Sequence, residues 1–259
     1  MIPYIEQTVW YIGPIPIQVW GTMVSLGILT ALFVITRRAK RLKLDVKIIS
    51  DAALWILVGA LIGARLVTVL FYDPSIYFEN PLEIFAIWHG GLSSVGGFIG
   101  AVVVGLWYFR RKQVDVWKYA DATIFGLPIG LGIGRIGCFL IHDHPGTASD
   151  FVLAVQYPDG EARLDHGLLL SINGFLMALV FAILARKKRP VGMYLVVFGI
   201  WYGAVRFYLD FYRIIDATYL GLTPAQYVSV VMFVAGMCGA WRLFHKSRAK
   251  ERLSTEKKT

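Results

Sequence analysis

Residues 16–36, PIQVWGTMVSLGILTALFVIT, carry no charged side chain and end directly before Arg37 and Arg38. A bilayer core is about 30 Å thick, so a helix needs roughly 20 apolar residues to cross it. This stretch therefore predicts a transmembrane helix. No basic segment precedes it, so we expect the helix to be retained in the mature chain and not cleaved as a signal peptide.

Apolar runs of similar length recur along the chain. Hydrophobic residues make up 57% of the 259 residues and charged residues only 17%, against about 25% in soluble domains. The sequence predicts an all-α integral membrane protein, a bundle of about seven transmembrane helices in a single membrane domain over residues 1–259. The other expected spans are 50–72, 85–109, 119–141, 167–185, 191–211 and 224–243.

Basic residues fix the expected orientation. Of the 26 Lys and Arg residues, 21 lie after the first, third and fifth spans or between Arg242 and Lys258, at the start of and within the tail at about 244–259. Cytoplasmic loops are enriched in Lys and Arg, so we expect a cytoplasmic tail and an N-terminus on the opposite side. The net charge of +9 thus reports topology, and no nucleic-acid partner is expected. Cys138 and Cys238 lie far apart in apolar segments, so we expect no disulfide.

Five arginines remain outside these basic clusters, namely Arg65, Arg135, Arg163, Arg206 and Arg213. An arginine within a span costs at least ~2.5 kcal/mol unless it is paired or hydrated, so such residues indicate functional sites. Arg135 and Arg206 are predicted in the outer halves of their helices, where a guanidinium suits bidentate phosphate binding. For Arg65, a structural pair with a carboxylate and a binding role are equally favoured.

Two glycine-rich segments accompany these arginines. Residues 88–100, WHGGLSSVGGFIG, open the third span, and residues 126–137, GLPIGLGIGRIG, surround Arg135 with small residues. Glycines let helix backbones approach closely or let a chain break to line a cavity. The second segment therefore predicts a pocket around one buried arginine.

Together with residues 189–192 and 202–213, these segments closely resemble the prolipoprotein diacylglyceryl transferase family of bacterial inner membranes. The resemblance covers most of the chain in order and is most specific at Gly134–Gly137 and at Tyr202–Arg206. It implies a multi-pass inner-membrane enzyme with its active site toward the periplasm. The implied reaction moves the diacylglyceryl group of phosphatidylglycerol onto the thiol of a lipobox cysteine and releases glycerol phosphate. Its partners are phosphatidylglycerol, a secreted lipobox-containing precursor or other thiol acceptor, and membrane lipids.

The resemblance also implies site residues, and it implies neither a metal nor an organic cofactor. Arg135 and Arg206 match the family's essential arginines, whose charge would stabilise a phosphate leaving group. The predicted substrate-binding residues are Tyr202, Gly146, Arg65, Gly96, Gly97 and His89.

Several positions depart from the family pattern. The usual core reads Gly-Arg-x-Gly-Asn-Phe-x-Asn-Gly-Glu, and here Cys138, Ile141 and Asp143 replace its two asparagines and its glutamate. A family histidine before the second Gly-Gly pair is Val95, so the corresponding base is missing. Trp20 replaces a tyrosine, and the motif that opens the fifth span is reduced to residues 165–170. The periplasmic loop at about 142–166 is also shorter than expected for the family.

The outer-loop run His142-Asp143-His144 is predicted to compensate, because an imidazole oriented by a carboxylate is a good base for a thiol. Two alternatives stay open for this run. One is a solvated loop with a capping aspartate, and the other is a zinc site formed with His166.

Two alternative functions also stay open. A divergent paralogue would transfer a lipid group to another acceptor, or would bind lipid without catalysis. A small transporter is the other alternative, since intramembrane charges also mark transport pathways, but the chain shows no matching halves.

Overall fold

A computed structural model describes residues 1–72, 74–86, 90–214 and 218–256, with side chains on the last helix described as far as His245. The described chain forms two compact units. Unit 1 comprises Met1–Ile35 and Asp121–Thr259, and unit 2 comprises Thr36–Ala120. Helices α1 (Val19–Arg41) and α5 (Val116–Ile124) each continue from one unit into the other.

The described residues are mostly helical, as the apolar runs predict. Five stretches are long and apolar enough to cross a membrane: Val19–Arg41, Val46–Tyr72, Val116–Ile141, His166–Leu184 and Pro224–His245. The expected spans at 85–109 and 191–211 form the shorter helices α4 (Ser94–Arg111) and α8 (Met193–Leu209). Helix α9 (Pro224–Glu256) continues past its apolar part into the basic tail.

Two predicted spans differ from the structure in detail. The run at 119–141 is divided into α5 and α6 (Leu127–Ile141), because Pro128 lacks an amide donor and disfavours a helical residue before it. The run at 85–109 begins its helix only at Ser94, where the Ser93 hydroxyl accepts a hydrogen bond from the Gly96 amide. Serine is a favoured N-cap, and this cap ends the preceding glycine-rich segment.

Unit 2 is built on the pair α2 (Val46–Val67) and α4. Gly63 on α2 faces Gly96 and Gly100 on α4 so closely that a methyl group at any of the three would overlap the opposite backbone. The close backbone approach expected from the glycine-rich segment is therefore confirmed. After α2, the chain continues through η1 (Thr68–Tyr72), α3 (Pro74–Glu79) and η2 (Pro81–Phe85).

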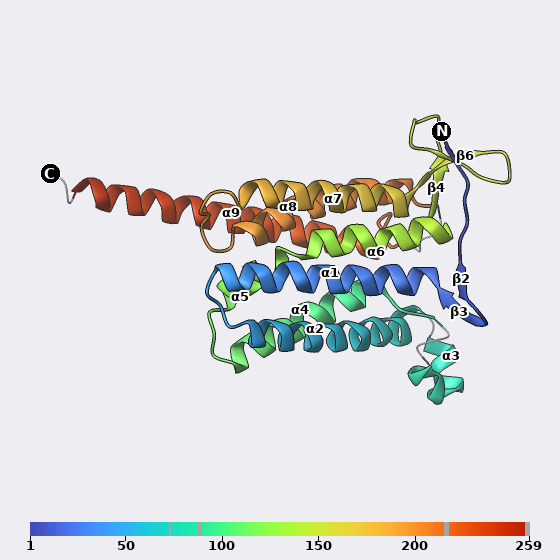
Figure 1. Ribbon diagram of the computed structural model, residues 1–259, viewed down its shortest axis with the longest axis horizontal. Coiled ribbons are helices and arrows are strands. Elements are labelled where there is room, and N and C mark those ends of the chain that lie inside the picture. The colour runs from blue at the N-terminus through green and yellow to red at the C-terminus, as the bar shows by residue number, and fades with distance from the viewer. Residues whose placement is uncertain (73, 87–89, 215–217, 257–259) are drawn as a thin grey trace. The chain divides into compact units, whose positions relative to one another are not determined.

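Unit 1 places α6, α7 (His166–Leu184), α8 and α9 side by side (Figure 1). Met177 and Phe181 of α7 pack against Tyr194 and Phe198 of α8 in a fully buried cluster. Helix α8 begins where the Tyr194 and Leu195 amides both donate to the Asp121 carboxylate, at 2.9 and 3.1 Å. Asp121, a buried carboxylate within the predicted span 119–141, thus caps a helix.

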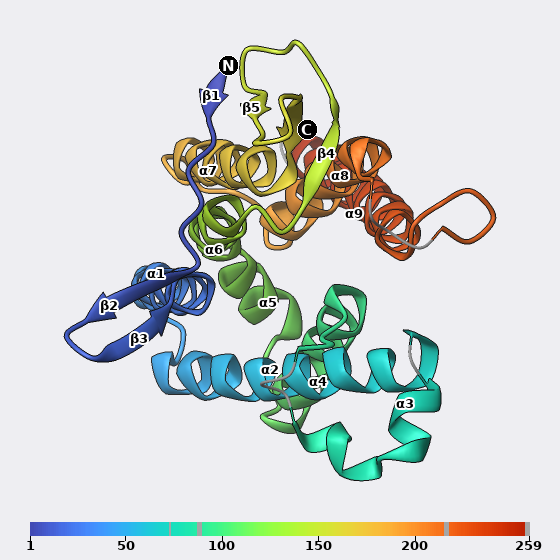
Figure 2. The ribbon, with the colours of Figure 1, turned by 90° about the vertical axis from the view of Figure 1, so that its right-hand side faces the viewer.

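The outer loop contains short β-strands, which the expectation of an all-α chain did not include. Strands β4 (Pro145–Ala148), β5 (Val155–Gln156) and β6 (Ala162–Asp165) join β1 (Ile2–Pro3) in a sheet of order β1-β5-β6-β4. Strands β2 (Val9–Ile12) and β3 (Ile15–Gln18) form a separate hairpin. Such short strands lack the long apolar periodicity that marks the helices. The four-stranded sheet lies at the ends of α6 and α7 (Figure 2).

Candidate active site

Arg135 lies on α6 within unit 1 and lines a small cavity between α6, α7 and α8. Asn173 of α7 and Tyr202 of α8 line the same cavity among mostly apolar side chains. Gly132 faces Gly174 on α7 so closely that a methyl group at Gly174 would lie 2.6 Å from the Gly132 amide nitrogen. The pocket predicted around this arginine is therefore present, and small residues bring its helices together.

Arg135 and Tyr202 each have a defined neighbour. The Arg135 Nη1 atom lies 3.6 Å from the Cys138 sulfur, one turn along α6. The Tyr202 ring stacks on Phe198 with 5.2 Å between ring centroids and 6° between ring planes. Tyr202 lines the same cavity as Arg135 and lies one helical turn before Arg206 on α8, so the three predicted site residues belong to one cluster.

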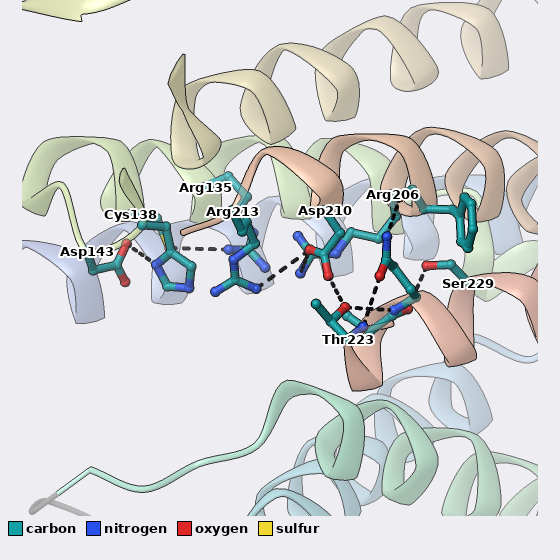
Figure 3. A network of polar contacts seen from close by, with 12 residues as sticks. Arg135, Cys138, Asp143, Arg206, Asp210, Arg213, Thr223 and Ser229 are labelled. Atoms are coloured by element: carbon teal, nitrogen blue, oxygen red, sulfur yellow. Dashed lines mark hydrogen bonds and ion pairs between the residues drawn. The ribbon is translucent and has the colours of Figure 1, made fainter. Parts of the chain in front are cut away.

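Arg206 forms the second half of this cluster, at the end of α8. Its Nη2 atom lies 3.0 Å from Asp210 Oδ1, and the Arg213 Nη1 atom lies 3.7 Å from the same oxygen (Figure 3). Within the described residues, the buried Arg206 Nη1 atom has no hydrogen-bond partner. Arg206 and Arg213 therefore share the single carboxylate of Asp210. A buried guanidinium is normally fully hydrogen-bonded, so the unpartnered Nη1 atom of Arg206 indicates a site for an anion.

Asp210 is itself held by the start of α9. The Thr223 hydroxyl donates to Asp210 Oδ2 and accepts from the Gln226 amide, while the Thr223 amide donates to the Gln226 side chain at 2.9 Å. This reciprocal pair is a capping box, and Pro224 occupies the first helical position. The spacing Thr-Pro-Ala-Gln is its signal in the sequence, which sequence reasoning did not use.

His142 takes a different partner from the one predicted. Its Nδ1 atom lies 2.8 Å from Asp165 Oδ2, not beside Asp143, and both side chains are 1% exposed. Tyr4 stacks on the imidazole at 4.2 Å, and the Tyr157 hydroxyl donates to the same Asp165 oxygen at 3.1 Å. This surrounding closes off the ring, so the structure favours a structural pair for His142. The catalytic role predicted for it has no support from this geometry.

Asp143 and His144 form the neighbouring pair, with 2.5 Å between His144 Nδ1 and Asp143 Oδ1 and both side chains about one-quarter exposed. Asp143 also acts electrostatically on Arg135. The zinc alternative is not supported, because the described residues contain no group of three His, Cys, Asp or Glu side chains placed to hold a metal. Cys138 and Cys238 are both free thiols, as expected.

Gly146 lies where strand β4 meets the arginine cluster. A methyl group there would lie 2.5 Å from the Leu164 carbonyl oxygen and 2.9 Å from that of Tyr212. Gly146 also pairs with Arg213 in an isolated β-bridge. The predicted site glycine therefore lets the outer sheet and the Arg213 backbone come together.

The remaining predicted residues lie in unit 2. The five N–H groups of Arg65 all donate to backbone carbonyls, those of Glu83, Ile84, Ala86, Gly90 and Gly91. This guanidinium therefore has no donor left for a lipid phosphate. Its partners are backbone carbonyls and not a carboxylate, so its role here is structural. Gly96 and Gly97 lie on α4, and His89 lies outside the described residues. Their binding roles stay predictions.

Known proteins resemble the chain over nearly its whole length. Residues 7–242 match the family described as "Prolipoprotein diacylglyceryl transferase". Proteins named "Phosphatidylglycerol--prolipoprotein diacylglyceryl transferase" from two strains of Pseudomonas fluorescens are 35% and 34% identical, over 96% of this chain and 97% and 98% of theirs. A protein of the same name from Geobacter sulfurreducens is 31% identical, over 91% of this chain and 94% of its own.

Proposed function

The chain belongs to the prolipoprotein diacylglyceryl transferase family, and we propose that it carries out that family's named reaction at the arginine cluster of unit 1. The substrates are phosphatidylglycerol and a prolipoprotein whose cysteine thiol accepts the diacylglyceryl group. The observation that carries the placement is the buried Arg206 guanidinium, which pairs with Asp210 through Nη2 and whose Nη1 atom is unpartnered among the described residues.

The roles of the residues follow from the charge that develops during transfer. The acceptor sulfur bonds to the terminal carbon of the diacylglyceryl group while the bond from that carbon to the phosphate oxygen breaks. Glycerol phosphate leaves with the electron pair, so negative charge grows on its oxygens. Arg135 and Arg206 would hold the phosphate before and during this step, because preorganised donors stabilise developing charge in a dry site. Asp210 fixes the Arg206 side chain and leaves its Nη1 edge for the ligand.

The membrane setting is proposed on the same basis. The chain is a multi-pass membrane protein with five apolar spans among its described residues. We place it in the bacterial inner membrane with seven crossings, an external N-terminus and a cytoplasmic basic tail, as the distribution of Lys and Arg favours. The arginine cluster would then face the periplasmic half of the membrane, where prolipoproteins emerge.

The test uses the purified protein in detergent with phosphatidylglycerol and a synthetic lipobox peptide. We expect release of glycerol phosphate and a gain of one diacylglyceryl unit in the peptide mass. Arg206→Lys and Arg135→Lys should each lower kcat about 100-fold or more, because an ammonium cannot replace the planar guanidinium fork. Arg163→Lys is the matched control, since Arg163 lies on the outer sheet and pairs with Glu161 and Asp159. Wild-type rates in both arginine variants would rule out the placement.

A further inference from the structure

His166 lies beside the arginine cluster, outside the residues that hold the phosphate in the proposed reaction. It is the first residue of α7 and is 0% exposed. Among the described residues neither ring nitrogen has a hydrogen bond of good geometry, although the Tyr212 carbonyl lies close enough to accept a weak one. The ring lies against Gly146, where a methyl group would be 3.3 Å from His166 Cδ2. Buried polar side chains are almost always hydrogen-bonded, so an imidazole without a well-formed hydrogen bond indicates a ligand or a chemical role.

The groups around His166 connect it to the proposed site. Arg206 from α8, Asp210 from η4 (Asp210–Tyr212) and Arg213 act electrostatically on its ring, together with the Tyr212 carbonyl. The adjacent Asp165 carboxylate is turned away, toward His142 and the Leu168 amide. His166 therefore presents a proton acceptor next to the groups proposed to hold the lipid phosphate.

The other histidines of the outer loop are less suited to accept a proton in the cluster. His142 uses Nδ1 for Asp165 and is enclosed by the Tyr4 and Tyr157 rings. His144 is already paired with Asp143 through Nδ1. The family histidine is replaced by Val95, which has no ionisable group. Among these residues, only His166 combines an imidazole that lacks a well-formed hydrogen bond with the neighbourhood of Arg206 and Arg213.

We propose that His166 is the base that takes the proton from the acceptor thiol, an inference that rests on the proposed function. The thiol proton moves to an imidazole nitrogen as the sulfur bonds to the diacylglyceryl carbon. The carbon–oxygen bond to the phosphate breaks, and glycerol phosphate leaves with that electron pair. The proton then passes from the imidazolium to the departing phosphate or to water, which restores the neutral ring.

The test compares wild type with His166→Gln over pH 7 to 9, using phosphatidylglycerol and the lipobox peptide. General bases contribute about 10²- to 10⁴-fold, so we expect kcat about 100-fold lower at pH 7. A free thiol ionises near pH 8.5, so kcat of the variant should rise about 20-fold by pH 9 while wild type changes little. The KM for phosphatidylglycerol should stay within about threefold, because the arginines remain. His245→Gln, on α9 with its ring tilted against that of Trp241, should behave like wild type.

A second variant separates a chemical role from a packing role. His166→Ala leaves space for added imidazole, which should restore part of the lost rate in protein that elutes as a single folded species. A folded His166→Gln that keeps more than half of the wild-type kcat at pH 7 would overturn the proposal. So would a rate loss that neither high pH nor imidazole relieves. Failure of the wild type to release glycerol phosphate would instead overturn the proposed function itself.

Discussion

The His142 ring nitrogen Nδ1 lies 2.8 Å from Asp165 Oδ2, with each side chain only 1% exposed. The Tyr157 hydroxyl shares that oxygen, and the other carboxylate oxygen accepts from the Leu168 amide at 3.0 Å. One buried carboxylate thus joins the end of α6, the outer sheet and the first turn of α7. Because α6 carries Arg135, and α7 begins with His166, this junction sets the position of two proposed site residues.

Replacing Asp165 should loosen the junction. Asp165→Ala removes an N-cap worth about 1 kcal/mol and leaves two buried partners, His142 and Tyr157, without an acceptor at about 1–3 kcal/mol each. We expect a loss of about 3 kcal/mol, seen as a lower melting temperature in detergent. Asp165→Asn keeps an oxygen acceptor and should lose less. Asp150→Ala, on the exposed part of the same loop, is the control and should stay within about 0.5 kcal/mol of wild type.

Tyr157 makes the stability of this junction depend on alkaline pH. Burial, and then the nearby Asp165 carboxylate, raise the pKa of Tyr157 above its usual value near 10. The unfolded chain therefore loses this proton at lower pH than the folded chain. The stabilisation is fully present below pH 10 and is lost as pH rises above it. Melting temperature should fall more steeply between pH 10 and 11 in wild type than in Tyr157→Phe. Equal slopes would contradict this assignment.

The sequence predicted the helical membrane fold because apolar length is a local property of the chain. It also predicted the Arg135 and Arg206 cluster, since an arginine within an apolar span needs a partner or a ligand. Arg213 was noted among the outlying arginines, but its pairing with Asp210 depends on how the chain turns after α8. Such contacts are set by the packing of the folded chain, and the periodicity of a single sequence does not reveal them.

The outer loop illustrates the limit most clearly. His142-Asp143-His144 suggested a histidine oriented by its neighbour, yet His142 selects Asp165, 23 residues along the chain. His142 adopts a left-handed backbone conformation, with φ of 48°, where α6 ends. That turn directs its side chain toward Asp165 at the end of β6, which sequence periodicity did not predict. For Arg65 the sequence left a carboxylate pair and a binding role equally favoured, and its partners are backbone carbonyls, which sequence does not reveal.

The contact between α2 and α4 should be highly sensitive to a single methyl group. In Gly100→Ala, the added carbon would overlap the Gly59 carbonyl, and relief requires the two helices to separate. Overpacking of this kind costs about 1–3 kcal/mol, more than the ~1 kcal/mol gained in helix propensity. We expect a lower melting temperature for Gly100→Ala. Gly97→Ala on the same helix meets only ordinary contacts at 3.5 and 3.6 Å, and it should be neutral or stabilising.

Thr223 links the cap of α9 to the arginine cluster, so its replacement should affect both stability and catalysis. Thr223→Val removes the hydroxyl that donates to Asp210 and accepts from the Gln226 amide. The lost cap should cost about 1 kcal/mol. A misplaced Asp210 would also release Arg206, so we expect kcat about tenfold lower in the phosphatidylglycerol and peptide assay.

Two further variants at this cap separate positioning from stability. Thr223→Ser keeps the hydroxyl and should restore both kcat and melting temperature. Gln226→Ala breaks the other half of the capping box but leaves the Thr223 hydroxyl on Asp210. It should therefore lower the melting temperature about as much as Thr223→Val while keeping kcat within about threefold of wild type. A loss of kcat in Gln226→Ala equal to that in Thr223→Val would mean that the cap alone, and not the bond to Asp210, supports the arginine cluster.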